Sequence, residues 1–228
     1  MRRNTVPTIK LIVVSTGAVA LSAVSAAGFF GPMAGDDAVL LQLPTLAMLI
    51  LVVAAAWADW IGTWGFVLAA VFLALHGVAA YYGYNNVPYD DWLDSLFGWR
   101  LATSLESDRN HYDRLIHFLY GLLLFLPVRQ SVERTIHIKS RSASWVAVSV
   151  LLSTSLLYEV GEWLVAVFMA PDVADRYNGQ QGDMWDAQKD MALAACGATV
   201  AAVLSLVAGY SSSSIAAPCS TAVTGRPE

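Results

Sequence analysis

The chain has 228 residues, of which 57% are hydrophobic and 14% are charged, and its mean hydropathy is +0.54. Because an average soluble domain is about 25% charged, this composition argues against an ordinary soluble enzyme and against a disordered chain. Thirteen basic and eighteen acidic residues give a net charge of −5, which argues against a nucleic-acid partner. The two cysteines provide neither a disulfide framework nor a Cys-x-x-Cys pair. The remaining class is an integral membrane protein.

Six apolar stretches can cross the hydrocarbon core as helices, which takes roughly 20 residues each. The fourth is short and reaches full length only if its helix begins near Asp113. The sequence therefore predicts an all-α, polytopic bundle of six transmembrane helices over 1–210, followed by a disordered tail over 211–228. Pro44 and Pro127 are expected near helix ends, where a missing N–H does little harm. The expected spans are 11–30, 39–58, 63–82, 113–128, 145–169 and 190–210.

The distribution of charge predicts which side of the membrane each loop faces. Eight of the thirteen basic residues lie in the N-terminal segment, the 129–144 loop and the C-terminal tail. The other five share the loops near 31–38, 83–114 and 170–189 with twelve acidic residues, and a thirteenth, Asp190, directly follows the last of these loops. Since basic residues are enriched in cytoplasmic loops, we expect both termini in the cytoplasm and the acidic loops on the outer side.

The first apolar stretch can also be interpreted as a secretory signal. Basic residues precede it, and the small residues at 22–27 fit a cleavage site. Its apolar run of about 20 residues exceeds the usual 7–15 of a signal core, which favours a retained helix. Cleavage would leave the orientation of the other five helices unchanged.

Ionisable side chains occur inside or at the ends of the predicted spans, where each costs several kcal/mol unless it faces a partner or water. The predicted topology puts six of them at the same outer depth of the bilayer, on four different helices. Groups that share a depth on neighbouring helices predict one polar pocket, open to the outer side. The six are His76, His117, Glu159, Glu162, Asp186 and Asp190.

Simpler roles stay open for several of these groups. Asp113, one turn before His117, can cap the fourth helix by accepting hydrogen bonds from free backbone N–H groups, and Asp186 can do the same for the sixth. A lone His76 is more often a hydrogen-bonded interior histidine than a ligand. Glu159 is harder to explain in this way, because roughly ten apolar or small residues separate it from either end of its helix.

Two further patterns predict how the helices pack and where they leave the bilayer. Gly121 in the fourth helix, and Gly197 among alanines in the sixth, are typical of close helix packing. Aromatic residues around the outer end of the third helix are typical of an interfacial belt. They are Tyr81, Tyr82, Tyr84, Tyr89, Trp92, Trp99 and Tyr112.

The stretch RNHYDRLIHF at 109–118 resembles the YjdF-like inner-membrane proteins, a bacterial family described as a domain of unknown function (DUF2238). The resemblance covers roughly residues 38–210 and implies a multi-pass protein of the bacterial cytoplasmic (inner) membrane. Tyr81 is a departure, because the family pattern implies a second histidine there. Further matching stretches are His76 with Tyr82 and Tyr84, Tyr158-Glu159 with Glu162-Trp163, and residues 181–191.

A weaker resemblance is to VanZ-like membrane proteins, a family linked to glycopeptide tolerance and cell-envelope lipids. It shares an Asp-x-x-x-His-Phe entry to one helix, a mid-helix Glu and a late acidic motif. In this chain the matching residues are Asp113, His117, Phe118, Glu159 and Asp190. Neither resemblance implies a particular reaction.

Three functions stay open. The first is a metal-dependent enzyme acting on a lipid or lipid-linked substrate of the cell envelope. The second is a proton- or cation-coupled small transporter, which the size of the chain favours only as a homo-oligomer. The third is a structural membrane scaffold without catalysis. Membrane lipids are the expected partners in each case.

The enzyme hypothesis assigns a role to each polar group of the predicted pocket. Mixed histidine and carboxylate ligands suit a divalent metal such as zinc, manganese or iron, and an open coordination position would activate water or substrate. No spacing as specific as His-Glu-x-x-His supports it. The expected metal ligands are His76, His117, Asp186 and Asp190, and the expected catalytic residues are Glu159, Glu162 and Asp113.

Overall fold

The computed structural model describes residues 8–33, 36–105, 109–168 and 180–215, and every regular element among them is helical. Six of these helices are long and apolar enough to cross a membrane, which confirms the predicted all-α bundle. They are α1 (Thr8–Gly28), α2 (Asp36–Trp57), α3 (Thr63–Tyr82), α6 (Tyr112–Ile136), α7 (Ser140–Phe168) and α9 (Asp186–Ile215). Shorter elements between α3 and α6 are η1 (Tyr84–Asn86), α4 (Tyr89–Phe97) and α5 (Leu101–Leu105).

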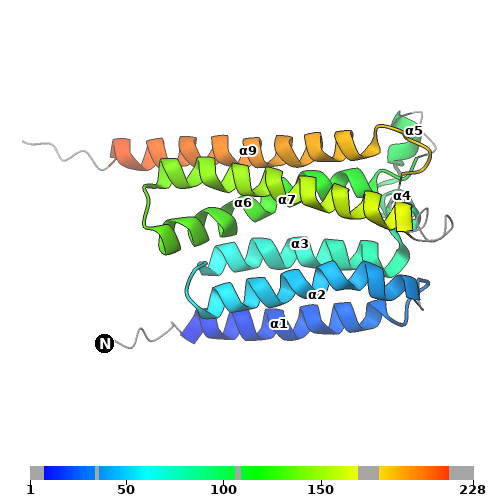
Figure 1. The fold of residues 1–228 in the computed structure, drawn as a ribbon, viewed down its shortest axis with the longest axis horizontal. Coiled ribbons are helices and arrows are strands. Elements are labelled where there is room, and N and C mark those ends of the chain that lie inside the picture. The colour runs from blue at the N-terminus through cyan, green and yellow to red at the C-terminus, as the bar shows by residue number, and fades with distance from the viewer. Residues whose placement is uncertain (1–7, 34–35, 106–108, 169–179, 216–228) are drawn as a thin grey trace, which may run out of the picture.

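The spanning helices form two groups of three (Figure 1). In one group α1, α2 and α3 pack against one another, and in the other α6, α7 and α9 do so. The groups meet mainly along a seam where α3 lies against α6, and this seam buries Phe72, Ile116 and Phe125. Since lipid is as apolar as these side chains, close packing rather than escape from water holds such a seam together.

Helix α6 is longer than the sequence predicts, because it continues past Pro127 and ends at Ile136. Pro127 was expected near a helix end but lies in the interior of α6, buried against the start of α3 beside Gly65. A proline is tolerated there because neighbouring helices and side chains can satisfy the backbone groups it frees. Pro44 likewise lies inside α2.

Helix α3 has the predicted bounds of 63–82, whereas α1, α2, α7 and α9 each begin before theirs. Helix α7 begins at Ser140 and α9 at Asp186, four to five residues earlier than expected. Helix α9 also continues to Ile215, through the first residues of the predicted disordered tail. The remainder of that tail, 216–228, lies outside the described residues.

The segment between α3 and α6 is folded into helical turns of its own. The Asp90 carboxylate accepts a hydrogen bond of 2.8 Å from the Leu101 N–H and so caps α5. Helix α4 ends at Gly98, whose φ of 65° is the left-handed conformation that glycine adopts readily. These elements lie at the end of the bundle where α9 begins (Figure 1), which is the predicted outer side.

Candidate metal centre

Asp113 and His117 lie one turn apart near the start of α6, and both side chains are buried. Their i,i+4 spacing puts them on one face of the helix, where Asp113 Oδ1 is 3.5 Å from His117 Nε2. Helix α6 begins at Tyr112, one residue before the predicted start at Asp113. Because α6 packs along α9 and also against α7, this face meets side chains from both helices.

Helices α7 and α9 each bring one buried carboxylate to the same place. Glu159 Oε1 of α7 is 3.7 Å from His117 Nδ1, and Asp190 of α9 is only 2% exposed. Donor atoms of Asp113, His117 and Asp190 all lie within 4.8 Å of one another. We call Asp113, His117, Glu159 and Asp190 the carboxylate–histidine cluster.

The cluster lacks the hydrogen bonds that buried carboxylates need. Within the described part of the chain, Glu159 Oε1 and Asp190 Oδ1 are buried without a hydrogen-bond partner. A buried charge is costly unless it is paired and hydrogen-bonded, and more so in a helix at membrane depth. The arrangement therefore requires an added positive charge, supplied either by protons or by a cation.

A network of ion pairs lies on the loop side of this cluster. Asp186 Oδ1 is 2.5 Å from Arg109 Nη2 and 2.8 Å from Arg114 Nη2. The same Arg114 nitrogen is 2.8 Å from Asp183 Oδ2, which also accepts a 2.6 Å hydrogen bond from Lys189. We call these five residues the arginine rim.

The arginine rim includes one of the predicted metal ligands. Asp186 was expected to bind metal; two guanidinium groups lie against its Oδ1, and among the described residues it is not one of the three whose donor atoms lie within 4.8 Å of one another. No role was predicted for Arg109 and Arg114 from the sequence. The available signal was their position: two cations flank Asp113 within an otherwise acidic loop.

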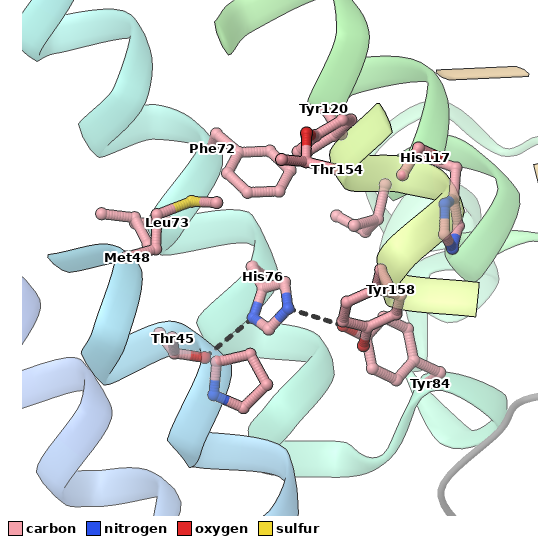
Figure 2. Close-up of a pocket in the computed structure, with 13 residues that line it drawn as sticks. Thr45, Met48, Phe72, Leu73, His76, Tyr84, His117, Tyr120, Thr154 and Tyr158 are labelled. Carbon is pink, nitrogen blue, oxygen red and sulfur yellow. Dashed lines mark hydrogen bonds between the residues drawn. The ribbon is translucent and has the colours of Figure 1, made fainter. Parts of the chain in front are cut away.

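His76 is a second predicted ligand that the structure keeps apart from the cluster. Its Nδ1 is 2.9 Å from Thr45 Oγ1, and its Nε2 is 2.8 Å from the Tyr84 hydroxyl (Figure 2). A metal-binding nitrogen needs a free lone pair, whereas both nitrogens of this ring face hydroxyl groups. The geometry is that of a hydrogen-bonded interior histidine, the simpler of the two roles considered.

The three predicted catalytic residues all lie on α6 and α7. Asp113 and Glu159 belong to the carboxylate–histidine cluster. Glu162, three residues further along α7, is half-buried and takes part in no hydrogen bond or ion pair with the residues that the structure describes. The roles assigned to these residues stay predictions.

A cavity of about 140 Å³ opens beside His117 (Figure 2). Its walls come mainly from α2, α3, α6 and α7 and are largely apolar, with hydroxyl groups from Thr45, Tyr120 and Ser155 among them. His117 lines this cavity and also belongs to the cluster. A ligand held in the cavity would therefore contact the imidazole directly.

Comparison with known proteins gives a family without a stated activity. Residues 12–210 match the family described as "Predicted membrane protein (DUF2238)". The chain is 35% identical over 122 residues to "Inner membrane protein YjdF" of Escherichia coli (strain K12), in an alignment covering 53% of this chain and 54% of that relative. The match thus spans about half the length of that relative. No solved structure matches the chain.

Proposed function

The chain belongs to the DUF2238 family of membrane proteins as a multi-pass inner-membrane protein, and we propose that it is a metal-dependent enzyme acting on a lipid or lipid-linked substrate of the cell envelope. The observation that carries this proposal is the buried group of Asp113, His117 and Asp190, whose donor atoms lie within 4.8 Å of one another. One imidazole and two carboxylates suit zinc, manganese or iron. Three protein ligands leave a coordination position for water or substrate, as in catalytic zinc sites.

The charge balance of the cluster supports a cation. Three carboxylates surround one imidazole, and two carboxylate oxygens, on Glu159 and Asp190, are buried without a hydrogen-bond partner among the described residues. A divalent cation would supply the missing positive charge beside these two oxygens. The nearby arginines do not compensate these oxygens, because Arg109 and Arg114 are directed to Asp186 and Asp183.

The proposed roles follow from the same geometry. A divalent metal lowers the pKa of bound water and polarises an ester or phosphoryl oxygen. Glu159, whose Oε1 lies beside the imidazole of the proposed ligand His117, is placed to accept a proton from such a water. In this proposal Asp113 is a ligand, and Asp186 orients the arginine rim instead of binding metal.

One observation favours an enzyme over a cation transporter. A second cavity, of about 360 Å³, lies further along α6, and its lining is largely apolar, with Leu124, Val128 and Val132 among its residues. Cations cross membranes along polar side chains or backbone carbonyls. An apolar cavity on this side of the cluster therefore suits hydrocarbon better than an ion.

The test is the metal content of the protein, purified in detergent without chelators and measured by elemental mass spectrometry. We expect close to one divalent metal ion per chain in the wild type. The metal content of the variants His117→Ala and Asp190→Asn should be at most about a tenth of that of the wild type, since each variant lacks one proposed ligand. Asp91→Asn, on exposed α4, is the matched control and should keep its metal.

Folding must be checked in the same preparations, by size-exclusion chromatography and by helical circular dichroism. A metal-free wild type that stays folded, even after incubation with zinc, manganese and iron, would overturn the proposal. Equal metal content in Asp190→Asn and the wild type would overturn the assigned ligand set.

A further inference from the structure

Two cavities lie end to end along the face of α6 that looks toward α2 and α7. The one beside His117 and the larger one beyond it share Met48 of α2 in their linings. Together their α6 residues run from Ile116 to Thr135, a rise of roughly 28 Å at about 1.5 Å per residue. This groove therefore follows α6 through most of the hydrocarbon core, which is about 30 Å thick.

The groove opens sideways to the bilayer. Helix α2 packs on α1 and α3, and α7 packs on α6 and α9, so α2 and α7 belong to different helix groups on either side of it. Leu51 of α2 and Val150 of α7 line the second cavity and are also exposed on the surface of the bundle. Since that surface lies within membrane-spanning helices, the medium that meets the mouth of the groove is lipid.

The end of the groove beside the cluster carries an unused polar group. Ser155 Oγ lines the first cavity, its side chain is buried, and it has no hydrogen-bond partner among the described residues. Ser155 lies one turn before Glu159 on the same face of α7, and His117 lines the same cavity. A buried hydroxyl without a partner is costly, so this position suits the polar end of a ligand.

We infer that the groove binds one acyl chain of a membrane phospholipid, with the ester end of the chain at Ser155 and the methyl end toward Val128. An acyl chain spans one leaflet, about 15 Å of hydrocarbon, which corresponds to roughly ten residues of α6 beyond His117. The apolar lining accepts the chain, and the polar end presents the ester to the cluster. The assignment of this lipid as substrate rests on the proposed function, whereas its binding does not.

The experiment uses the full chain in vesicles of phosphatidylethanolamine and phosphatidylglycerol that contain a phosphatidylglycerol with a diazirine at the end of one acyl chain. After photolysis, labelled residues are mapped by peptide mass spectrometry. We expect the label on Met48, Leu124 and Val128, with about a tenfold loss in Met48→Trp, because the indole fills the junction of the two cavities. Leu152→Trp, on the lipid-facing side of α7, is the control and should label as the wild type does.

A second blocking variant, Val128→Phe, keeps the test decisive if Met48→Trp fails to fold, and it should show the same loss. Label spread over lipid-facing residues such as Leu157 and Leu204, or undiminished groove labelling in a folded blocking variant, would overturn the inference. Asp190→Asn, which removes a proposed metal ligand that lines neither cavity, should retain groove labelling. Groove labelling in a wild type that contains no metal would support lipid binding and refute the proposed metal-dependent enzyme. A wild type that contains metal but shows no groove labelling would support the metal site and refute lipid binding in the groove.

Discussion

Two glycines bring the backbones of α6 and α9 into direct contact. A Cβ at Gly121 would lie 2.0 Å from the carbonyl oxygen of Ala194, and a Cβ at Gly197 would lie 2.0 Å from that of Phe118. Only a hydrogen fits at either position, as expected of small residues in packed membrane helices. Gly121 lies one turn after His117, so this crossing also sets the separation of His117 and Asp190.

Replacing Gly121 by Ala should force the two helices apart. Overpacking a tight contact costs roughly 1–3 kcal/mol, and we expect a lower midpoint of thermal unfolding in detergent together with weaker metal retention. Gly161→Ala on α7 is the matched control, because no heavy atom lies within 4 Å of the added Cβ. The control should unfold at or above the wild-type temperature, since alanine favours helix. An unchanged midpoint in Gly121→Ala would refute the contact.

Asp183 in the arginine rim makes stability depend on pH. The hydrogen bond from Lys189, helped by the Trp185 N–H, lowers the pKa of Asp183 from 3.8 to about 2. A carboxyl group whose pKa is lower in the folded state stabilises that state above its unfolded pKa and loses this contribution as pH falls. The stability difference between wild type and Asp183→Asn should therefore be constant above about pH 4 and shrink toward pH 2. Thermal unfolding across this range measures it, and a difference that persists undiminished would contradict the pairing.

At the scale of elements, the sequence predicts what depends on local composition and misses what depends on neighbours. Apolar runs of about 20 residues identify six spans, but nothing local shows that α6 continues past Pro127, which is buried against α3. The depth argument brings His117, Glu159 and Asp190 together correctly. It does not separate His76, whose partners Thr45 and Tyr84 lie on other elements. The depth argument also does not predict the ion pairs that Arg109 and Arg114 form with Asp186.

Helix α4 was not predicted from the sequence, but its composition indicates where it lies relative to the membrane. Trp92, Leu96 and Phe97 are exposed on one side of it, and acidic residues occupy the other. A short amphipathic helix of this kind suits the interface between headgroups and acyl chains. We therefore expect the Phe97 side of α4 to insert into the membrane and the Ser95 side to face water.

Fluorescence of a bimane label can distinguish these two sides. Phe97→Cys and Ser95→Cys are made in a Cys196→Ala, Cys219→Ala background and reconstituted into vesicles. The label at position 97 should emit at shorter wavelength and be quenched by nitroxide-bearing lipids, because it lies among acyl chains. The label at position 95 should respond to aqueous iodide instead. If iodide quenched the label at both positions and nitroxide-bearing lipids quenched it at neither, α4 would lie outside the membrane.

At the scale of the whole molecule, the two helix groups have different roles. The carboxylate–histidine cluster belongs to α6, α7 and α9 alone, whereas the groove also needs α2 and α3 of the other group. The groups meet mainly along the α3–α6 seam, so a change in their angle would widen or close the groove without moving the cluster. Binding of a chain and integrity of the cluster are therefore separable properties of the fold.

The side of the membrane that the cluster faces follows from the charge distribution. Basic residues favour the cytoplasm, so Ser140, after the basic α6–α7 turn, is expected inside, and Ser95 on α4 is expected outside. In the same cysteine-free background, a membrane-impermeant maleimide applied to spheroplasts should label Ser95→Cys at once and Ser140→Cys only after lysis. This outcome places the cluster and the arginine rim within reach of periplasmic solutes and away from cytoplasmic ATP, so phosphoryl transfer from ATP would be excluded as the reaction. If Ser140→Cys alone were labelled in intact spheroplasts, the bundle would have the opposite orientation, with the cluster facing the cytoplasm.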